Sequence, residues 1–277
     1  MTNGASRQSP ICLDGPLARR HRASLIGTGD KLVVFSHGLG TDQSVWNGVL
    51  SHLADDYRAL VFDLPGAGPL LPADFDPDDY HALTVFADDV LALLDEVGVT
   101  QCQFVGHSVS GMIAALAAVE APDLFAQLIL LNASPRYLNA PGYVGGFDAA
   151  DIDGLLRAMA TNYQAWVAGF APAALDEDVG PEVEHFSACL MAMRPDITVR
   201  VARTIFNSDY RGLLPALSTP TALIHSRNDI AVPPQVADFM HSHIQRSTLT
   251  WIDASGHLPH MTAPAHVAKA LRASLAH

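Results

Sequence analysis

A serine lies at the centre of a small-residue turn in this chain of 277 residues. Residues 104–113 run from an apolar strand pattern through Gly106, Ser108 and Ser110 directly into an apolar helix pattern. A turn this tight strains the backbone of its central residue, leaves room only for small neighbours and exposes the central side chain. The pattern predicts that Ser108 is a nucleophile. The alternative is that Ser108 only caps the following helix, since serine is a favoured residue at that position.

A serine hydroxyl needs a base to accept its proton and a carboxylate to orient that base. In a parallel sheet such groups meet at the carboxyl ends of the strands. His257 follows a predicted strand over residues 249–252, and Asp229 follows another over residues 222–225. Asp253 is the alternative acid, but it shares a loop with His257. We favour Asp229, because it comes from the neighbouring strand end and can approach the imidazole from the side.

A His-Gly turn follows the first long predicted strand, within residues 36–46. Such a turn commonly supplies one amide of an oxyanion hole, and the residue after the nucleophile supplies the other. The predicted donors are therefore the backbone amides of Leu39 and Val109. The alternative is a glycine-rich turn that has no chemical role.

Metal ions and organic cofactors are not expected. His257 and His260 have a spacing at which two imidazoles could share an ion, but no third ligand is nearby in the sequence, and zinc sites need three or four. No glycine-rich string continues to the third glycine of a dinucleotide-binding fingerprint. The three cysteines are far apart, which gives no disulfide framework and fits a reducing compartment: Cys12, Cys102 and Cys189.

The elements that must position these residues alternate between strand and helix patterns, which indicates an α/β protein with a mostly parallel sheet. Short apolar runs predict strands over residues 32–36, 59–63, 103–106, 128–131, 222–225 and 249–252. Apolar residues at helical spacing predict helices over residues 83–97, 109–120 and 267–275.

One segment does not follow this alternation. Between residues 134 and 211 there is no strong strand pattern, and helical stretches are broken by glycine and proline. The clearest stretches are residues 151–170 and 181–193, and Pro195 could begin another helix, since proline is tolerated at a first helical position. We expect residues 1–133 and 212–277 to form the core and residues 134–211 to form a helical lid.

Composition excludes several classes of function. The formal net charge of −13 argues against nucleic acid or an anionic membrane as a partner, because both need a positive face. Hydrophobic residues make up 49% and charged residues only 16%, which excludes a disordered chain. The longest apolar run, residues 112–119, is far shorter than the ~20 residues of a membrane span. The first 20 residues lack the apolar core of a signal peptide, so we expect a cytoplasmic protein.

With these residues assembled, the chain resembles the α/β-hydrolase superfamily, in which Ser, Asp and His follow in this order. More narrowly, it resembles the group of the bacterial stress-response hydrolase RsbQ and the plant karrikin and strigolactone receptors. The matching strings are HGLGTDQSVW, GHSVSGMIA, SPRYLN, GGF, NYQAWVAGFAP, MRPDI, TIFNSD and GHLPHM, between residues 37 and 261. Serine at position 110 is at home in this group. The resemblance implies helices on both faces of the sheet and a four-helix lid over Ser108.

The resemblance also implies a deep apolar pocket beneath that lid. Together with Leu39, the matching positions that should line it are aromatic: Tyr137, Phe147, Trp166, Phe170 and Phe206. The alternative is that some of these rings only pack the lid. The plant receptors carry phenylalanine where this chain has Leu39, so the identity of the ligand does not carry over.

Two functions fit these expectations. The first is a serine hydrolase that cleaves an ester or lactone of a small apolar substrate through an acyl-enzyme on Ser108. The second is a ligand sensor whose lid engages a signalling protein, with slow or incidental hydrolysis, as the resemblance allows. A dehalogenase would need aspartate at position 108, whereas a cofactor-free haloperoxidase would use the same three residues.

Overall fold

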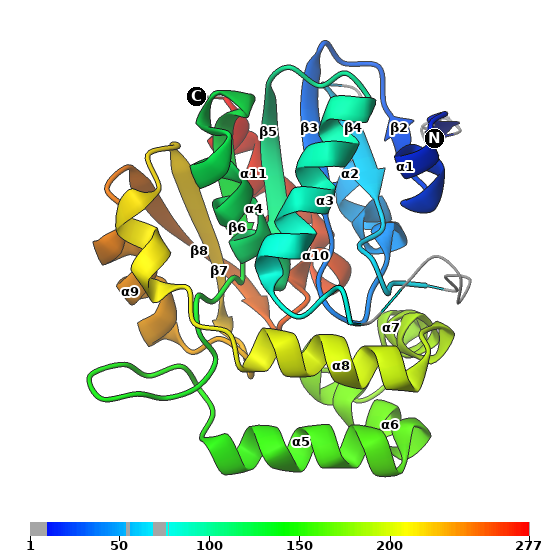
Figure 1. The fold of residues 1–277 in the computed structure, drawn as a ribbon, viewed down its shortest axis with the longest axis vertical. Coiled ribbons are helices and arrows are strands. Elements are labelled where there is room, and N and C mark those ends of the chain that lie inside the picture. The colour runs from blue at the N-terminus through cyan, green and yellow to red at the C-terminus, as the bar shows by residue number, and fades with distance from the viewer. Residues whose placement is uncertain (1–9, 54–55, 69–75, 77, 277) are drawn as a thin grey trace, which may run out of the picture.

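An eight-stranded sheet lies at the centre of the computed structural model, which describes residues 10–53, 56–68, 76 and 78–276 (Figure 1). The strands are β1 (Ile11–Cys12), β2 (Ser24–Ile26), β3 (Lys31–Ser36), β4 (Tyr57–Phe62), β5 (Cys102–His107), β6 (Phe125–Leu131), β7 (Thr221–Asn228) and β8 (Ser247–Ser255). Their order across the sheet is β1-β2-β4-β3-β5-β6-β7-β8. All pairings from β4 to β8 are parallel, which confirms the predicted mostly parallel sheet.

The six predicted strands are present as β3 to β8. The two strands that were not predicted, β1 and β2, have two and three residues and form an antiparallel edge. Elements this short cannot show a repeating apolar pattern. Their pairing depends on contacts with β4 that the local sequence does not encode.

Helices cover both faces of the sheet, as predicted (Figure 1). One face carries α3 (Leu83–Glu96), α4 (Val109–Glu120) and α9 (Pro234–His243). The other carries α2 (Asn47–Leu50), α10 (Pro259–Thr262) and α11 (Pro264–Leu275). Helix α1 (Pro16–Arg20) lies beside α3, and short 3-10 turns form at η1 (Gln43–Trp46), η3 (Pro122–Leu124) and η4 (Arg211–Ala216).

The central strands are apolar on both sides because each side faces a helical layer. Along β3, Val34 packs into the cluster beneath α3 and α4, whereas Val33 and Phe35 pack into the cluster beneath α2 and α11. All three side chains are buried. Successive residues of a strand point to opposite faces, so a strand covered on both sides is apolar throughout.

Four further helices lie between β6 and β7 in the chain and beyond one end of the sheet in space (Figure 1). They are α5 (Ala149–Thr161), α6 (Tyr163–Leu175), α7 (Pro181–Ala192) and α8 (Pro195–Phe206). The helical stretch predicted over residues 151–170 is two helices, because Asn162 caps the second one through its side chain. The division into a core of residues 1–133 and 212–277 and a lid of residues 134–211 stays a prediction. Of the predicted core, residues 1–9, 54–55, 69–75, 77 and 277 lie outside the described residues.

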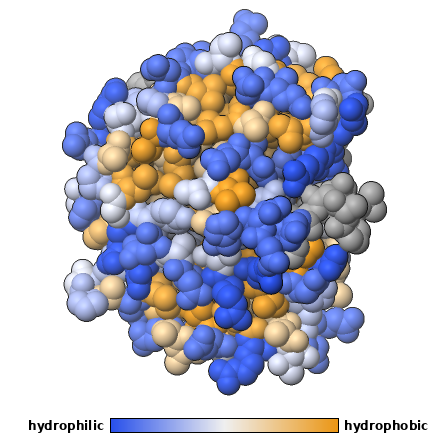
Figure 2. Space-filling model, in the orientation of Figure 1, coloured by the Kyte–Doolittle hydropathy of each residue, from blue (hydrophilic) through white to orange (hydrophobic). Residues whose placement is uncertain are grey.

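The surface mixes polar and apolar side chains. On the face shown in Figure 2, polar side chains separate several apolar patches over the sheet-covering helices and over the helices beyond the sheet. Within the described residues, no helix combines the length and the apolar character needed to cross a membrane. A cytoplasmic location stays a prediction.

Candidate active site

Ser108 lies at the turn between β5 and α4, as the small-residue pattern predicted. Its backbone has φ 57° and ψ −123°, a conformation that L-residues rarely adopt. The turn is so close that a Cβ atom on Gly106 would lie 2.5 Å from the carbonyl oxygen of Ser110, which explains the glycine. The Ser108 side chain makes no capping hydrogen bond to α4, so the hydroxyl is available for other contacts.

The structure brings the hydroxyl of Ser108, the imidazole of His257 and the carboxylate of Asp229 into one line of contacts. Ser108 Oγ lies 2.8 Å from His257 Nε2, and His257 Nδ1 lies 2.8 Å from Asp229 Oδ2. A carboxylate only accepts hydrogen bonds, so Nδ1 carries the ring proton and Nε2 is left as an acceptor. This tautomer can accept the proton of Ser108.

Tyr137 makes a second contact with Ser108. Its hydroxyl lies 3.2 Å from Ser108 Oγ and can donate to it, because the proton of Ser108 faces His257. Burial raises the pKa of the Tyr137 phenol above its ordinary value, although its hydrogen bond with Ser108 opposes this. Tyr137 is therefore a neutral hydroxyl group beside Ser108.

Asp229 is held rigidly. Its side chain is 1% exposed, and its second oxygen, Oδ1, accepts the backbone amides of Ala231 at 2.8 Å and Val232 at 3.1 Å. The alternative acid, Asp253, is exposed, and within the described residues its carboxylate makes no hydrogen bond to His257. The geometry therefore places Asp229, rather than Asp253, beside the imidazole.

The backbone of His257 is fixed from three sides. Its carbonyl oxygen accepts His107 Nε2 at 2.7 Å and Asn132 Nδ2 at 3.2 Å, and its amide donates to the carbonyl of Ala174 at 2.6 Å. Ala174 belongs to α6, so one of the helices beyond the sheet directly holds the loop of His257. The position of this imidazole is thus coupled to the position of α6.

Asn132 is a site residue that the sequence reasoning missed. It is fully buried directly after β6, with a φ of 47°. Its Oδ1 accepts the amide of Ser226 at 2.8 Å, and its Nδ2 faces the hydroxyl of Ser226 and the carbonyls of Gly256 and His257. One side chain therefore joins the segments that carry Asp229 and His257. A polar residue at a strand's carboxyl end was the signal that could have identified it.

We expect Asn132→Gly to lower kcat for ester hydrolysis by about 10- to 100-fold with little change in KM. Glycine tolerates the positive φ, so the variant removes the side-chain contacts without adding backbone strain. A misplacement of the imidazole by about 1 Å can cost about 10²-fold in rate. Steady-state kinetics and thermal melting of the same samples test this. A lower melting temperature with unchanged kcat would show that Asn132 only stabilises the fold.

Two further histidines stack behind His257. The ring centroid of His107 lies 5.0 Å from that of His257 and 4.3 Å from that of His260, which in turn lies 4.6 Å from Trp46. Burial lowers the pKa of His107 well below its ordinary value and that of His260 to about 3. Both rings are neutral near pH 7, so they place no positive charge beside His257. Within the described residues, no third ligand joins His257 and His260 in a metal site.

The two predicted oxyanion donors both border one hollow, whose lining includes Val109, the residue after Ser108, but not Ser108 itself. Val109 is the first residue of α4, where a backbone amide has no partner within the helix. Neither its amide nor that of Leu39 donates a hydrogen bond to any group in the described part of the chain. Both amides are therefore free to bind a ligand oxygen.

The orientation of the Leu39 amide follows from the preceding peptide bond. His37 Nε2 accepts the amide of Leu64 at 2.9 Å, so the ring proton is on Nδ1, which donates to the carbonyl of Gly38 at 2.9 Å. The hydroxyl of Thr41 donates to the same carbonyl at 2.9 Å. In the trans peptide between Gly38 and Leu39, the N–H of Leu39 points opposite to the carbonyl of Gly38. Because His37 and Thr41 hold that carbonyl, the Leu39 amide points away from these two side chains.

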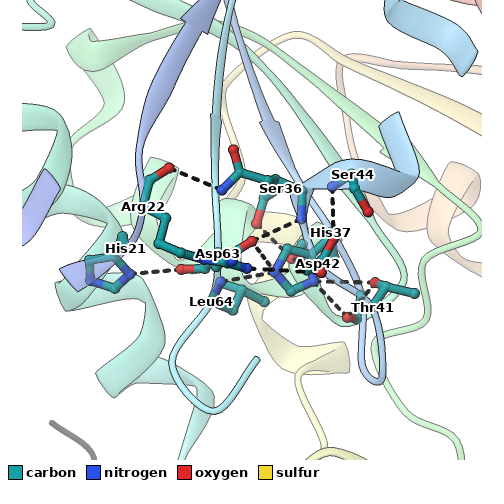
Figure 3. A network of polar contacts seen from close by, with 12 residues as sticks. His21, Arg22, Ser36, His37, Thr41, Asp42, Ser44, Asp63 and Leu64 are labelled. Carbon is teal, nitrogen blue, oxygen red and sulfur yellow. Dashed lines mark hydrogen bonds and ion pairs between the residues drawn. The ribbon is translucent and has the colours of Figure 1, made fainter. Parts of the chain in front are cut away.

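A buried polar network supports this loop (Figure 3). Asp63 is 2% exposed, accepts the amide of Gln43 at 2.9 Å and pairs closely with the guanidinium of Arg22. On the other side, the Ser110 hydroxyl donates to the carbonyl of His37. Serine at position 110 therefore has a specific role, because it ties the start of α4 to the His-Gly turn.

The hollow beside the two amides is small and mostly apolar. Its empty volume is about 340 Å³, part of which is open to solvent. Besides Leu39 and Val109, its lining includes residues from the core and from the helices beyond the sheet: Leu64, Phe86, Ile113, Met193, Val201 and Ile205. The walls thus come from both sides, and they suit a compact apolar group.

The five aromatic residues predicted to line a pocket fall into two groups, neither of which borders this hollow. Tyr137 and Phe147 each pack edge-on against Phe206, at ring-centroid distances of 5.3 Å and 6.1 Å. On α6, Trp166 and Phe170 stack with their centroids 4.8 Å apart. Tyr137 touches the nucleophile, whereas for the other four a role in ligand binding stays a prediction.

Comparisons with known proteins agree with the motifs. A model of the alpha/beta hydrolase family matches residues 33–270. The chain is 44% identical to a strigolactone esterase of Pisum sativum over 262 residues, which cover 94% of this chain and 98% of that relative. It is 43% identical to a karrikin insensitive 2 receptor of Petunia hybrida over 90% of this chain and 93% of the relative. The predicted resemblance is confirmed.

A comparison of structures gives the same result. A hydrolase from Oleispira antarctica has a TM-score of 0.89 and 31% sequence identity, with 96% of this chain and 98% of that one covered. The predicted fold class is therefore confirmed as well.

Proposed function

Because this chain belongs to the alpha/beta hydrolase family and is a hydrolase, we propose that it cleaves a small apolar ester or lactone through Ser108, His257 and Asp229. The observation that carries the proposal is the unbroken line of two 2.8 Å contacts from the serine hydroxyl through the imidazole to the buried carboxylate. This arrangement makes an otherwise unreactive hydroxyl nucleophilic.

In the first step, Ser108 Oγ attacks the substrate carbonyl carbon while His257 Nε2 takes the hydroxyl proton. Asp229 holds the imidazole in the accepting tautomer and stabilises the imidazolium that forms. His257 then gives the proton to the leaving alkoxide oxygen, and an acyl group remains on Ser108. In the second step, His257 activates a water molecule, which releases the acid and restores the serine. No metal or organic cofactor enters either step.

The amides of Leu39 and Val109 would bind the negative oxygen of the tetrahedral intermediate. A donor of this kind typically contributes about 3 to 4 kcal/mol of transition-state stabilisation. The position of Val109 at the start of α4 adds the positive end of the helix dipole. The hollow between these amides and the apolar side chains of α8 would hold the compact apolar part of the substrate.

A second candidate function is a ligand sensor that signals through the helices α5 to α8. The hydrogen bond from the His257 amide to Ala174 of α6 supports it, because a ligand that moves the imidazole would also displace this helix. The 43% identical relative that is named a receptor points the same way. In this case a signalling protein would bind the rearranged lid, and hydrolysis would be slow.

Hydrolysis of a series of p-nitrophenyl esters tests the proposal. We expect many turnovers on the acetate and butyrate and a steep fall in kcat/KM for the octanoate, because the hollow is small. If the protein instead turned over an ester only once and slowly, and if binding of the intact ester greatly raised the melting temperature of the protein, the sensor function would be favoured. Release of p-nitrophenol no faster than in buffer would contradict both functions.

A further inference from the structure

A group of side chains of the kinds that bind metal ions lies at the contact between α7 and the loop that follows β3, and it includes none of the three proposed catalytic residues. It consists of Asp42, His185 and Cys189. One carboxylate oxygen, one imidazole nitrogen and the thiol sulfur all lie within 4.8 Å of one another. We infer that these three residues bind one zinc-like divalent transition-metal ion.

The fold itself brings the three ligands together. His185 and Cys189 are four residues apart on α7, so both side chains lie on one face of the helix. Asp42 precedes the 3-10 turn η1 in the loop opposite. The helix packs directly on the backbone of this loop. A Cβ atom on Gly40, whose φ is 79°, would lie only 2.5 Å from the side chain of Leu190 in α7. Little rearrangement is needed to close the ligands around an ion.

Ser44 contacts two of the three ligands. The Ser44 amide donates to Asp42 Oδ1 at 2.9 Å, and the Ser44 hydroxyl lies 2.9 Å from His185 Nε2. Ser44 therefore links two of the ligands, as residues behind a metal site commonly do. The guanidinium of Arg22 is 3.9 Å from Asp42 but pairs much more closely with Asp63 (Figure 3).

The kinds of donor atom indicate the kind of ion. A thiolate and an imidazole with one carboxylate favour Zn²⁺ over Mg²⁺ or Ca²⁺, which prefer sites made of oxygen atoms alone. Cys189 would bind as the thiolate, and its proton would pass to the solvent. Three protein ligands leave one tetrahedral position for water. His185 is exposed, so an ion can reach the site without the fold opening.

An ion at this position would pin α7 to the loop that carries the Leu39 amide. The site therefore goes beyond the proposed hydrolysis, which needs no metal. The sequence does not predict this group, because Asp42 is far from α7 along the chain and the histidine pair with a suitable spacing is His257 and His260.

Cobalt and zinc titrations of the full chain test the inference. The protein is stripped with EDTA, kept reduced with a phosphine and titrated with Co²⁺. We expect one equivalent to give thiolate-to-cobalt absorption in the near ultraviolet and the visible bands of a tetrahedral site. Zn²⁺ should displace the Co²⁺ and raise the melting temperature. Cys189→Ser should abolish the near-ultraviolet absorption, and His185→Ala should weaken binding by more than about 100-fold, since even residues behind metal ligands contribute 10- to 100-fold.

Matched controls come from the same chain. Cys12→Ser and His241→Ala change an exposed cysteine and an exposed histidine outside the group and should bind Co²⁺ like the wild type. Circular dichroism of the metal-free variants shows whether each one folds. Absence of equimolar binding in the wild type, or a cobalt spectrum that survives in folded Cys189→Ser, would overturn the inference. The ester assay is independent, so failure of one proposal leaves the other standing.

Discussion

Replacing Ser108 with alanine should lower kcat/KM for p-nitrophenyl acetate by about 10⁴-fold or more, which corresponds to about 5.5 kcal/mol of transition-state stabilisation. The variant keeps the turn, the amides of Leu39 and Val109, and the pair of His257 and Asp229, but it has no atom that can form the acyl-enzyme. Any remaining rate would come from binding and the oxyanion donors alone. Steady-state kinetics with an active-site titration of the wild type measures this loss.

The control for this variant is the replacement of a serine on the surface. Ser51 is exposed, and among the described residues its hydroxyl donates only to the carbonyl of Gly48, so Ser51→Ala should keep wild-type activity. Ser108→Ala removes the hydrogen-bond partner of the buried Tyr137 hydroxyl, so we expect a small fall in melting temperature, and circular dichroism shows that the variant is folded. Activity within about tenfold of the wild type would contradict the assigned nucleophile.

Asp229→Asn should lower kcat by about 10⁴-fold although the side chain keeps its size. The asparagine carbonyl can still accept the amides of Ala231 and Val232, so its NH₂ group faces His257 Nδ1. His257 Nδ1 must then accept a hydrogen bond from this NH₂ group, so the ring proton moves to Nε2. An imidazole protonated at Nε2 cannot take the proton of Ser108. The kinetics of the folded variant, compared with the wild type, test this consequence.

Asp253→Asn is the matched control, because both carboxylates lie near the end of a strand close to His257 in the sequence or in space. Asp229 directly follows β7, and Asp253 is the third-last residue of β8. Asp253 is exposed, and in the described part of the chain its carboxylate makes no hydrogen bond or ion pair, whereas its backbone carbonyl accepts His266 Nδ1 at 2.8 Å. We expect less than a twofold change in kcat. If Asp253→Asn were the more damaging of the two replacements, the assigned acid would be wrong.

The three proposed catalytic residues could be predicted from the sequence because the topology of a parallel sheet determines where they lie. Ser108, Asp229 and His257 each come just after an apolar strand, and strands of one parallel sheet end at the same edge. Their convergence could therefore be expected without coordinates. The helices predicted over residues 109–120 and 181–193 also match α4 and α7 closely, since their apolar patterns are clear.

Other features depend on contacts that no local pattern records. Asn132 acts through carbonyls of Gly256 and His257, more than a hundred residues away in the chain. The hollow beside Leu39 is bordered by α8 together with α3 and α4, and the aromatic residues carried over from the resemblance do not border it. Likewise, Asp42, His185 and Cys189 lie close together only because α7 packs against the loop after β3.

The most direct test of the central claim is covalent labelling by a fluorophosphonate, followed by peptide mass mapping of the full chain. The phosphorus reacts with a serine that an adjacent base has activated, so the account predicts one label per molecule, located on Ser108. Labelling should disappear in Ser108→Ala and slow severely in Asp229→Asn. An enzyme that hydrolyses esters yet carries the label on another residue, or on none, would contradict the account.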